Sequence, residues 1–179
     1  MPILFCIKHL GKKRKNFIGK IDKMFSIIIP TFNNIQYLKL CISSIKKNSK
    51  FDHEIIPHIN VGTDGTEDFL IRENIKYTIT KYNSGICEGM NKAARTAKFD
   101  YILYGHDDFY FCPGWDVVLK KEVDKIGHKN FYLSGTMIGT SGKDSLNCGT
   151  NIENFNEKKL LENYQKLNFI DFQGSTWAP

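Results

Sequence analysis

Short apolar runs alternate with amphipathic segments along most of the chain. The apolar runs are rich in β-branched and aromatic residues and predict strands at 25–29, 54–61, 75–80, 101–104, 131–138 and 169–172. The segments between them predict helices at 35–47, 68–73, 87–98, 115–126 and 156–166. Strand and helix alternate without a hairpin before residue 130. This order predicts an α/β fold, a three-layer α/β/α sandwich with a mainly parallel sheet.

Particular residues predict where some of these strands lie in the sheet. The continuous run Phe-Ser-Ile-Ile-Ile at 25–29 is typical of a central parallel strand, which is buried on both faces. Pro57 interrupts the second strand and predicts an edge strand or a bulge there. The run at 101–104 predicts another buried strand. Asn34 is placed to cap the first helix.

The positive charge of the chain is concentrated at its N-terminal end. The 179 residues carry a net charge of +6, and residues 1–23 hold seven basic residues and one acidic residue. The remainder is therefore neutral, which argues against nucleic-acid binding, because that function needs basic residues on the folded surface. We expect residues 1–23 to be a flexible basic extension and residues 24–179 to be the folded domain.

The extension is too short and too basic for a membrane-spanning helix or a signal peptide. It is either a solvated tail or an arm that touches an anionic membrane surface. The five cysteines are widely spaced and include no Cys-x-x-Cys pair, so free thiols in a reducing compartment are expected. These features predict a cytoplasmic protein, either free or peripheral at the membrane.

Polar residues that suit a binding site follow several predicted strands. Asp107 and Asp108 come directly after strand 101–104, and Asp64 follows the strand that contains Pro57. In parallel α/β sheets, ligands bind outside the carboxyl ends of the strands. Two adjacent carboxylates are costly to desolvate, so such a pair is typical of a cation site or of a titrating pair.

Four segments in this order resemble a family 2 glycosyltransferase of the GT-A fold. They are Phe-Ser-Ile-Ile-Ile-Pro-Thr-Phe-Asn-Asn at 25–34, Asp-Gly-Thr-Glu-Asp at 64–68, Asn-Ser-Gly at 83–85 with Asn91 behind it, and Asp107-Asp108 with Pro-Gly-Trp at 113–115. The resemblance implies transfer of a sugar from a nucleoside diphosphate sugar, UDP-linked, to a hydroxyl of a glycan, lipid-linked or protein acceptor. It also implies inversion at the sugar and help from Mn²⁺ or Mg²⁺, because the departing diphosphate gains negative charge.

The resemblance assigns roles to individual residues. Asp108 would bind the metal directly, and Asp107 would contact the metal or the ribose. Asp64 would accept hydrogen bonds from the base edge. The nucleotide pocket would be lined by Pro30, Thr31 and Asn33, and its wall near the ribose and diphosphate would be shaped by Asn83, Gly85 and Asn91.

This chain departs from the family pattern at three places. Thr63 stands where the family often has an acidic residue, and Gly89-Met90 stands where it often has an arginine. His106 occupies the position of the first acidic residue in a strict Asp-x-Asp motif, where it would be a metal ligand or a packing residue. These differences leave the nucleotide and the sugar open.

The general base of an inverting transferase is expected to lie beyond Pro179, because the family places it well downstream of the metal site. Asp171 is the nearby carboxylate within the chain. The chain is therefore expected to lack part of the acceptor region. The alternative is a nucleotide-sugar-binding module without transfer activity.

Two other functions fit the sequence less well. A nucleotidyltransferase would need glycine and a basic residue near the first strand, and residues 30–34 contain neither. A nucleic-acid binder would have to rely on residues 1–23 alone and would bind in a salt-dependent way.

Overall fold

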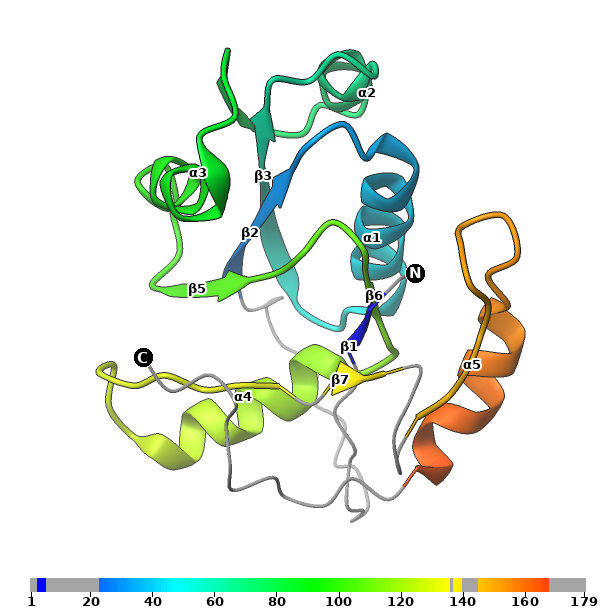
Figure 1. Cartoon of the computed structure of the whole chain (residues 1–179). Helices are drawn as coiled ribbons and strands as arrows, with labels where there is room; N and C mark the ends of the chain where they lie inside the picture. Colours follow the sequence, from blue (N-terminus) through cyan, green and yellow to red (C-terminus); the bar gives the residue numbers. More distant parts are fainter. Residues whose placement is uncertain (1–2, 6–22, 136, 140–144, 168–179) are drawn as a thin grey trace.

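The computed structural model describes residues 3–5, 23–135, 137–139 and 145–167. The main sheet contains β2 (Lys23–Thr31), β3 (Asp52–Asn60), β4 (Thr78–Thr80) and β5 (Tyr101–Tyr104) in the order β4-β3-β2-β5 (Figure 1). All of its pairings are parallel. β2 lies between β3 and β5, so the predicted central strand is confirmed. The carboxyl ends of the strands consequently meet at one edge of the sheet.

Helices cover both faces of this sheet. The described helices are α1 (Ile35–Asn48), α2 (Thr66–Arg72), α3 (Gly85–Ala94), α4 (Trp115–Ile126) and α5 (Glu157–Asn163), with a 3₁₀ turn at Tyr164–Lys166. Of these, α5 packs in a second core with Tyr110 of the strand at 109–111 and Ile138 of the strand at 137–138 instead of on the main sheet. α1 and α3 lie on opposite sides of the sheet in Figure 1. Ile27 and Ile29 of β2 pack with Leu38 of α1 on one face, whereas Ile28 packs with Ala93 of α3 on the other. The predicted three-layer α/β/α sandwich is confirmed.

The helices form where the sequence predicts them, with some ends shifted. α4 has the predicted bounds, whereas α3 ends at Ala94 rather than at residue 98. None of the described helices combines the length and the apolar character that crossing a membrane requires.

A second, smaller sheet contains β6 (Phe109–Phe111), β1 (Ile3–Phe5) and β7 (Met137–Ile138) in the order β6-β1-β7. β1 runs parallel to β6 and antiparallel to β7. Neither β1 nor β6 was expected. Within the described part of the strand predicted at 131–138, only β7 forms a strand. Part of the stretch 1–23 thus pairs with the domain. Residues 6–22 lie outside the described part, and the domain boundary stays a prediction.

The expectation for Pro57 is wrong. β3 pairs with both β2 and β4 and is an inner strand, and the irregularity in its pairing with β2 falls between Lys23 and Ser26 instead. Pro57 is buried opposite Ile29. β4 pairs only with residues 58–60 of β3, so it makes no ladder hydrogen bond to Pro57. On that side of β3 the missing N–H of proline therefore costs no sheet hydrogen bond.

The expectation that 101–104 is a fully buried strand is also wrong. β5 lies at the end of the four-stranded sheet, and the Ile102 side chain is 50% exposed. Alternate side chains of a strand point to opposite faces. Tyr101 and Leu103 accordingly pack against the main core, while Ile102 points to the other face. An apolar run does not reveal which of its faces another element covers.

α4 is fastened to the start of β3 by a buried carboxylate. Asp116 is fully buried, and its Oδ2 accepts hydrogen bonds from the backbone N–H groups of Lys50 (2.6 Å) and Phe51 (2.8 Å) and from His53 Nε2 (3.2 Å). The N–H of Phe25 donates to Nδ1 of His53, which places the ring proton on Nε2. Burial alone would raise the pKa of Asp116, but these hydrogen bonds outweigh burial and lower it.

α3 approaches the sheet closely at Gly89. A Cβ atom at this position would lie 2.5 Å from Cδ2 of His58, whose ring is fully buried. Nδ1 of His58 is 2.7 Å from Oγ1 of Thr78, so the ring is held in place. The glycine therefore lets α3 pack over a fixed imidazole.

We predict that Asp116→Asn lowers the free energy of unfolding by about 2–4 kcal/mol at neutral pH, because it removes an ionised buried acceptor. The folded pKa of Asp116 is depressed, so its stabilisation is complete above the unfolded value of about 3.9 and is lost as the pH falls through the folded pKa. Urea unfolding at neutral pH and in steps down to about pH 3 should show the difference from the parent shrinking. Asp100→Asn, at a carboxylate that is 69% exposed, serves as the control and should change little.

We predict that Gly89→Ala destabilises the protein by about 1–3 kcal/mol, although alanine favours a helix by about 1 kcal/mol over glycine. The added methyl group meets the ring of His58. Urea unfolding should be compared with that of Cys87→Ala, an exposed position on the same helix where the change should be small. Equal stability of Gly89→Ala and the parent would contradict the close approach of α3.

Candidate functional site

Four loops follow the carboxyl ends of the main-sheet strands. They are residues 32–34 after β2, 61–65 after β3, 81–84 after β4 and 105–108 after β5. Most of the predicted site residues fall within these loops or next to them, whereas Asn91 lies inside α3 and Asp171 lies outside the described residues. Hydrogen bonds connect the loops after β2, β3 and β5 to one another, so these three form one continuous rim.

Asp107 connects the loop after β5 to the end of β2. Thr31 Oγ1 donates a hydrogen bond of 2.7 Å to Asp107 Oδ2, and the side chain of Asn34 donates to the same carboxylate. Burial raises the pKa of Asp107, and these two hydrogen bonds oppose that rise. Asn34 occupies the N-cap position of α1, but its side chain makes no capping hydrogen bond. The predicted cap is therefore wrong, because the amide of Asn34 is used by Asp107.

Asp64 supplies the capping hydrogen bond that Asn34 does not. Its Oδ2 accepts from the N–H of Ile35, the first residue of α1, at 2.8 Å. Its Oδ1 accepts from Thr66 at the start of α2, from N–H at 3.2 Å and from Oγ1 at 2.7 Å. Burial opposes ionisation of Asp64, yet these hydrogen bonds lower its pKa. One ionised carboxylate thus accepts hydrogen bonds at the N-termini of two helices, α1 and α2.

The loops after β2 and β3 also meet through Asn33. Asn33 Oδ1 accepts a 2.8 Å hydrogen bond from the N–H of Thr63, and its backbone is left-handed with φ of 48°. Val61 has φ of 68°, which is strained for a β-branched residue. Such strain persists only where the surrounding structure holds it in place, and it often accompanies functional sites. The strained residue Val61 lies directly after β3, at the start of the rim loop 61–65.

Asp108 differs from its neighbour in having an oxygen without a partner. Within the described part of the chain, Asp108 Oδ1 is the one buried side-chain oxygen or nitrogen that lacks a hydrogen-bond partner. Burial raises the pKa of Asp108, and the nearby His106 opposes that rise. A buried carboxylate oxygen in this situation costs free energy unless a donor or a cation satisfies it.

His106 and Tyr104 border the two carboxylates. The ring of His106 packs against the rings of Tyr104 and Phe109, with centroids 4.7 and 4.9 Å apart. Burial and the nearby Cys87, Asp107 and Asp108 raise the pKa of the Tyr104 hydroxyl to about 12. Tyr104 thus stays a neutral donor near the carboxylates. The sequence gives no signal for this tyrosine, because it ends an apolar run and looks like a core residue.

The remaining described residues of the predicted site lie on β2, on α3 and in the turn between β4 and α3. Pro30 is buried at the end of β2, and Asn91 is exposed on α3. Asn83 Oδ1 accepts from the N–H of Gly85 at 3.0 Å, and Gly85 has the left-handed φ of 70° that glycine favours. Asp171 lies outside the described residues.

A model of glycosyl transferase family 2 matches residues 26–178. The chain belongs to this family. The match includes the rim and both adjacent carboxylates, so the resemblance of the four sequence segments is confirmed at the level of the family.

Individual relatives of this family 2 member are distant. An uncharacterized glycosyltransferase of Haemophilus influenzae is 28% identical over 94 residues, which cover 50% of this chain and 31% of the relative. The crystal structure of S. aureus TarS 1-349 has a TM-score of 0.52 and 23% identity, covering 57% of this chain and 32% of that one. The same TarS fragment in complex with UDP-GlcNAc has a TM-score of 0.52, 24% identity and coverage of 57% and 31%.

These similarities confirm the expected GT-A type of fold. At this level of identity the solved structures establish the fold alone. The chain spans about a third of the length of the relatives that it matches.

The carboxylates fit the divalent cation that the family resemblance implies. The described residues include no group of three or more His, Cys, Asp or Glu side chains arranged to hold a metal. Mg²⁺ and similar cations are commonly held by one or two carboxylates, with phosphate and water oxygens as the other ligands. Asp108, with its unpartnered Oδ1, and the adjacent Asp107 match that kind of site.

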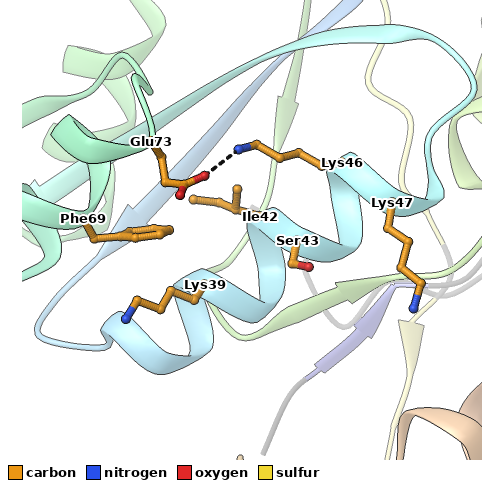
Figure 2. Close-up of a pocket in the computed structure, with 7 residues that line it drawn as sticks. All are labelled: Lys39, Ile42, Ser43, Lys46, Lys47, Phe69 and Glu73. Carbon is orange, nitrogen blue, oxygen red and sulfur yellow. Dashed lines mark hydrogen bonds and ion pairs between the residues drawn. The ribbon is translucent and has the colours of Figure 1, made fainter.

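A separate groove of about 560 Å³ lies between α1 and α2, away from the carboxylates (Figure 2). Its lining residues are Lys39, Ile42, Ser43, Lys46, Lys47, Phe69 and Glu73. Lys46 Nζ is 3.1 Å from Glu73 Oε2, and Lys39 Nζ is 5.3 Å from the centre of the Phe69 ring. None of the predicted site residues lines it.

We predict that Asp108→Asn stabilises the metal-free protein by about 1–2 kcal/mol, because it removes a buried charge whose Oδ1 lacks a partner. The matched variant Asp107→Asn should gain less, because it disturbs hydrogen bonds from Thr31 and Asn34. Thermal unfolding in the presence of a chelator measures both. A drop in melting temperature for Asp108→Asn would show that Asp108 is a structural residue.

Proposed function

We propose that this family 2 chain binds a nucleoside diphosphate sugar at the carboxyl edge of the main sheet and transfers the sugar to an acceptor hydroxyl with inversion. Mn²⁺ or Mg²⁺, bound by Asp108 and Asp107, would act as a Lewis acid for the departing diphosphate. The observation that carries the proposal is the buried, unpartnered Oδ1 of Asp108 beside a second carboxylate at the end of β5. A role in packing the apolar core does not explain why two adjacent carboxylates lie at this strand end.

The roles of the rim residues follow from what holds them. Thr31 and Asn34 donate to Asp107, which fixes its side chain and leaves Asp108 Oδ1 available to a cation. Preorganised groups of this kind do not have to reorient when charge develops on the leaving group. Asp64 is ionised and held by α1 and α2, so it is suited to accept hydrogen bonds from a base edge.

UDP is the nucleotide to test first. S. aureus TarS, which shares the fold, is known in complex with UDP-GlcNAc. We propose that Pro30, Thr31 and Asn33 line the nucleotide pocket, with Asn83, Gly85 and Asn91 beside the ribose and diphosphate. The acceptor is a glycan, a lipid-linked sugar or a protein, and Asp171 is the candidate general base within this sequence.

Donor binding and transfer are separable parts of this proposal. The described residues supply the carboxylates and the rim of the donor site, whereas the proposed general base Asp171 lies outside them. A nucleotide-sugar-binding module without transfer activity would have the same described site. Measuring donor binding first and transfer second therefore tests the two parts in order.

We predict that UDP binds in the presence of Mn²⁺ and that Asp108→Ala weakens this binding by at least about tenfold, or 1.4 kcal/mol. Calorimetric titration of UDP with Mn²⁺, and again with a chelator in its place, measures both effects. Asp100→Ala is the control, because that carboxylate is 69% exposed and pairs with Lys129 instead.

UDP binding that depends neither on the metal nor on Asp108 would overturn the proposed metal site. If UDP fails to bind, GDP should be titrated under the same conditions. Failure of both nucleotides would remove the donor site. Release of UDP from UDP-GlcNAc that depends on an added acceptor would establish transfer and exclude the module without activity.

A further inference from the structure

The turn between β4 and α3 is held by a different set of contacts from the three loops of the rim. It carries Asn83 and Gly85, and Ser84 lies between them. Ser84 donates twice to one oxygen of Asn60 at the end of β3. Its N–H lies 3.0 Å and its Oγ 2.8 Å from Asn60 Oδ1. Asn60 is only 4% exposed, so these hydrogen bonds are largely shielded from water.

Ser84 occupies the N-cap position of α3, yet its hydroxyl makes no capping hydrogen bond. A serine at this position ordinarily accepts from the helix backbone. Here the hydroxyl is turned toward β3 instead. The hydroxyl of Ser84 therefore bonds to the sheet and not to the helix. This choice of partner indicates that the position of the turn on the sheet matters.

A second buried residue supports the same turn from β4. Thr80 is 4% exposed, and its Oγ1 donates to the backbone oxygen of Tyr82 at 2.8 Å. The Thr80 backbone oxygen accepts from the N–H of Val61 at 2.9 Å. Behind them, His58 Nε2 lies 3.4 Å from Thr80 Oγ1 and 3.5 Å from Ser84 Oγ. The turn is thus fixed on its inner side by buried polar groups of two strands.

We infer that Asn60 and Ser84 are positioning residues that hold Asn83 and Gly85 in the arrangement that receives the nucleoside diphosphate donor. The inference rests on the proposed function for the donor, but the contacts that carry it do not involve Asp107 or Asp108. Asn83 and Gly85 are exposed and have a short local hydrogen bond of their own. The hydrogen bonds from Ser84 to Asn60 tie the turn to β3, and those from Thr80 to Tyr82 and to Ser84 tie it to β4.

Preorganisation of the turn connects its anchorage to the affinity for the donor. An exposed turn without anchorage samples many backbone conformations, and a ligand that selects one of them binds more weakly by the fraction of time spent in it. Two hydrogen bonds to a single buried oxygen restrict both the backbone and the side chain of Ser84. The cost of ordering the turn is then met during folding and not during binding.

The test uses Ser84→Ala, which removes the hydroxyl and keeps Asn83 and Gly85. Its matched control is Ser49→Ala. Ser49 Oγ donates to the backbone oxygen of Ile45 at 2.7 Å and accepts from Trp115 Nε1 at 3.2 Å. It lies at the end of α1, about 20 Å from the start of that helix at the rim. Ser84→Thr, which keeps a hydroxyl, is the rescue variant.

Two measurements are made on the full chain and these variants. Amide hydrogen exchange of residues 81–86 reports whether Ser84 holds the turn. Calorimetric titration of UDP with Mn²⁺ reports whether the turn matters to the donor. We expect Ser84→Ala to speed exchange in this segment and to weaken UDP binding about tenfold, as when the competent turn is populated a tenth of the time. Ser49→Ala should leave both unchanged, and Ser84→Thr should restore both.

Unchanged exchange at residues 81–86 in Ser84→Ala would overturn the inference. Faster exchange with unchanged UDP affinity would also overturn it, because the turn would then be held without serving the donor. Equal losses of affinity in Ser84→Ala and Ser49→Ala would reduce the role of Ser84 to general stability. Absence of nucleotide binding in the parent would be a failure of the proposed function, and it would overturn the donor role assigned to the turn while exchange still decided the anchorage.

Discussion

The hydrogen bond from Thr31 to Asp107 is the contact on which the geometry of the rim depends. Thr31 ends the central strand and is only 2% exposed, so it gives the loop after β5 a fixed reference point. With Asp107 held there, Asp108 is carried to a position where its Oδ1 is buried without a partner. The position of the adjacent carboxylate is thus set by the central strand, not by the edge strand β5 that precedes it.

The carboxylates that are fully or partly buried in this protein differ in what surrounds them. Asp64 and Asp116 each accept several hydrogen bonds, and their pKa values are lowered despite burial. Asp108 has a pKa that burial raises, and one of its oxygens is unsatisfied. The first two stabilise the fold in the charged state, whereas the third weakens it. Asp64 and Asp116 thus contribute to the stability of the fold, whereas the fold holds Asp108 at a cost in stability. Such a cost is characteristic of functional sites.

Local patterns in the sequence predicted much of the fold, including the central strand, the bounds of α4 and the placement of the candidate residues at strand ends. They failed where distant segments decide the outcome. Pro57 suggested an edge strand, because the short length of β4 beside it is not visible locally. Asn34 looked like a helix cap, because its attachment to Asp107 joins residues far apart in the sequence. The anchorage of Ser84 by Asn60 was missed for the same reason.

The place of β1 between β6 and β7 has a consequence for the order of folding. Ile3 pairs with Phe109, and Leu4 pairs with Ile138, so both partners of β1 are made more than 100 residues after it. At about 5–20 residues per second, roughly 7–30 s separate the appearance of β1 from that of β7. Contacts this distant in sequence slow folding. The four-stranded sheet, complete by Tyr104, is therefore available as a template well before the smaller sheet can close.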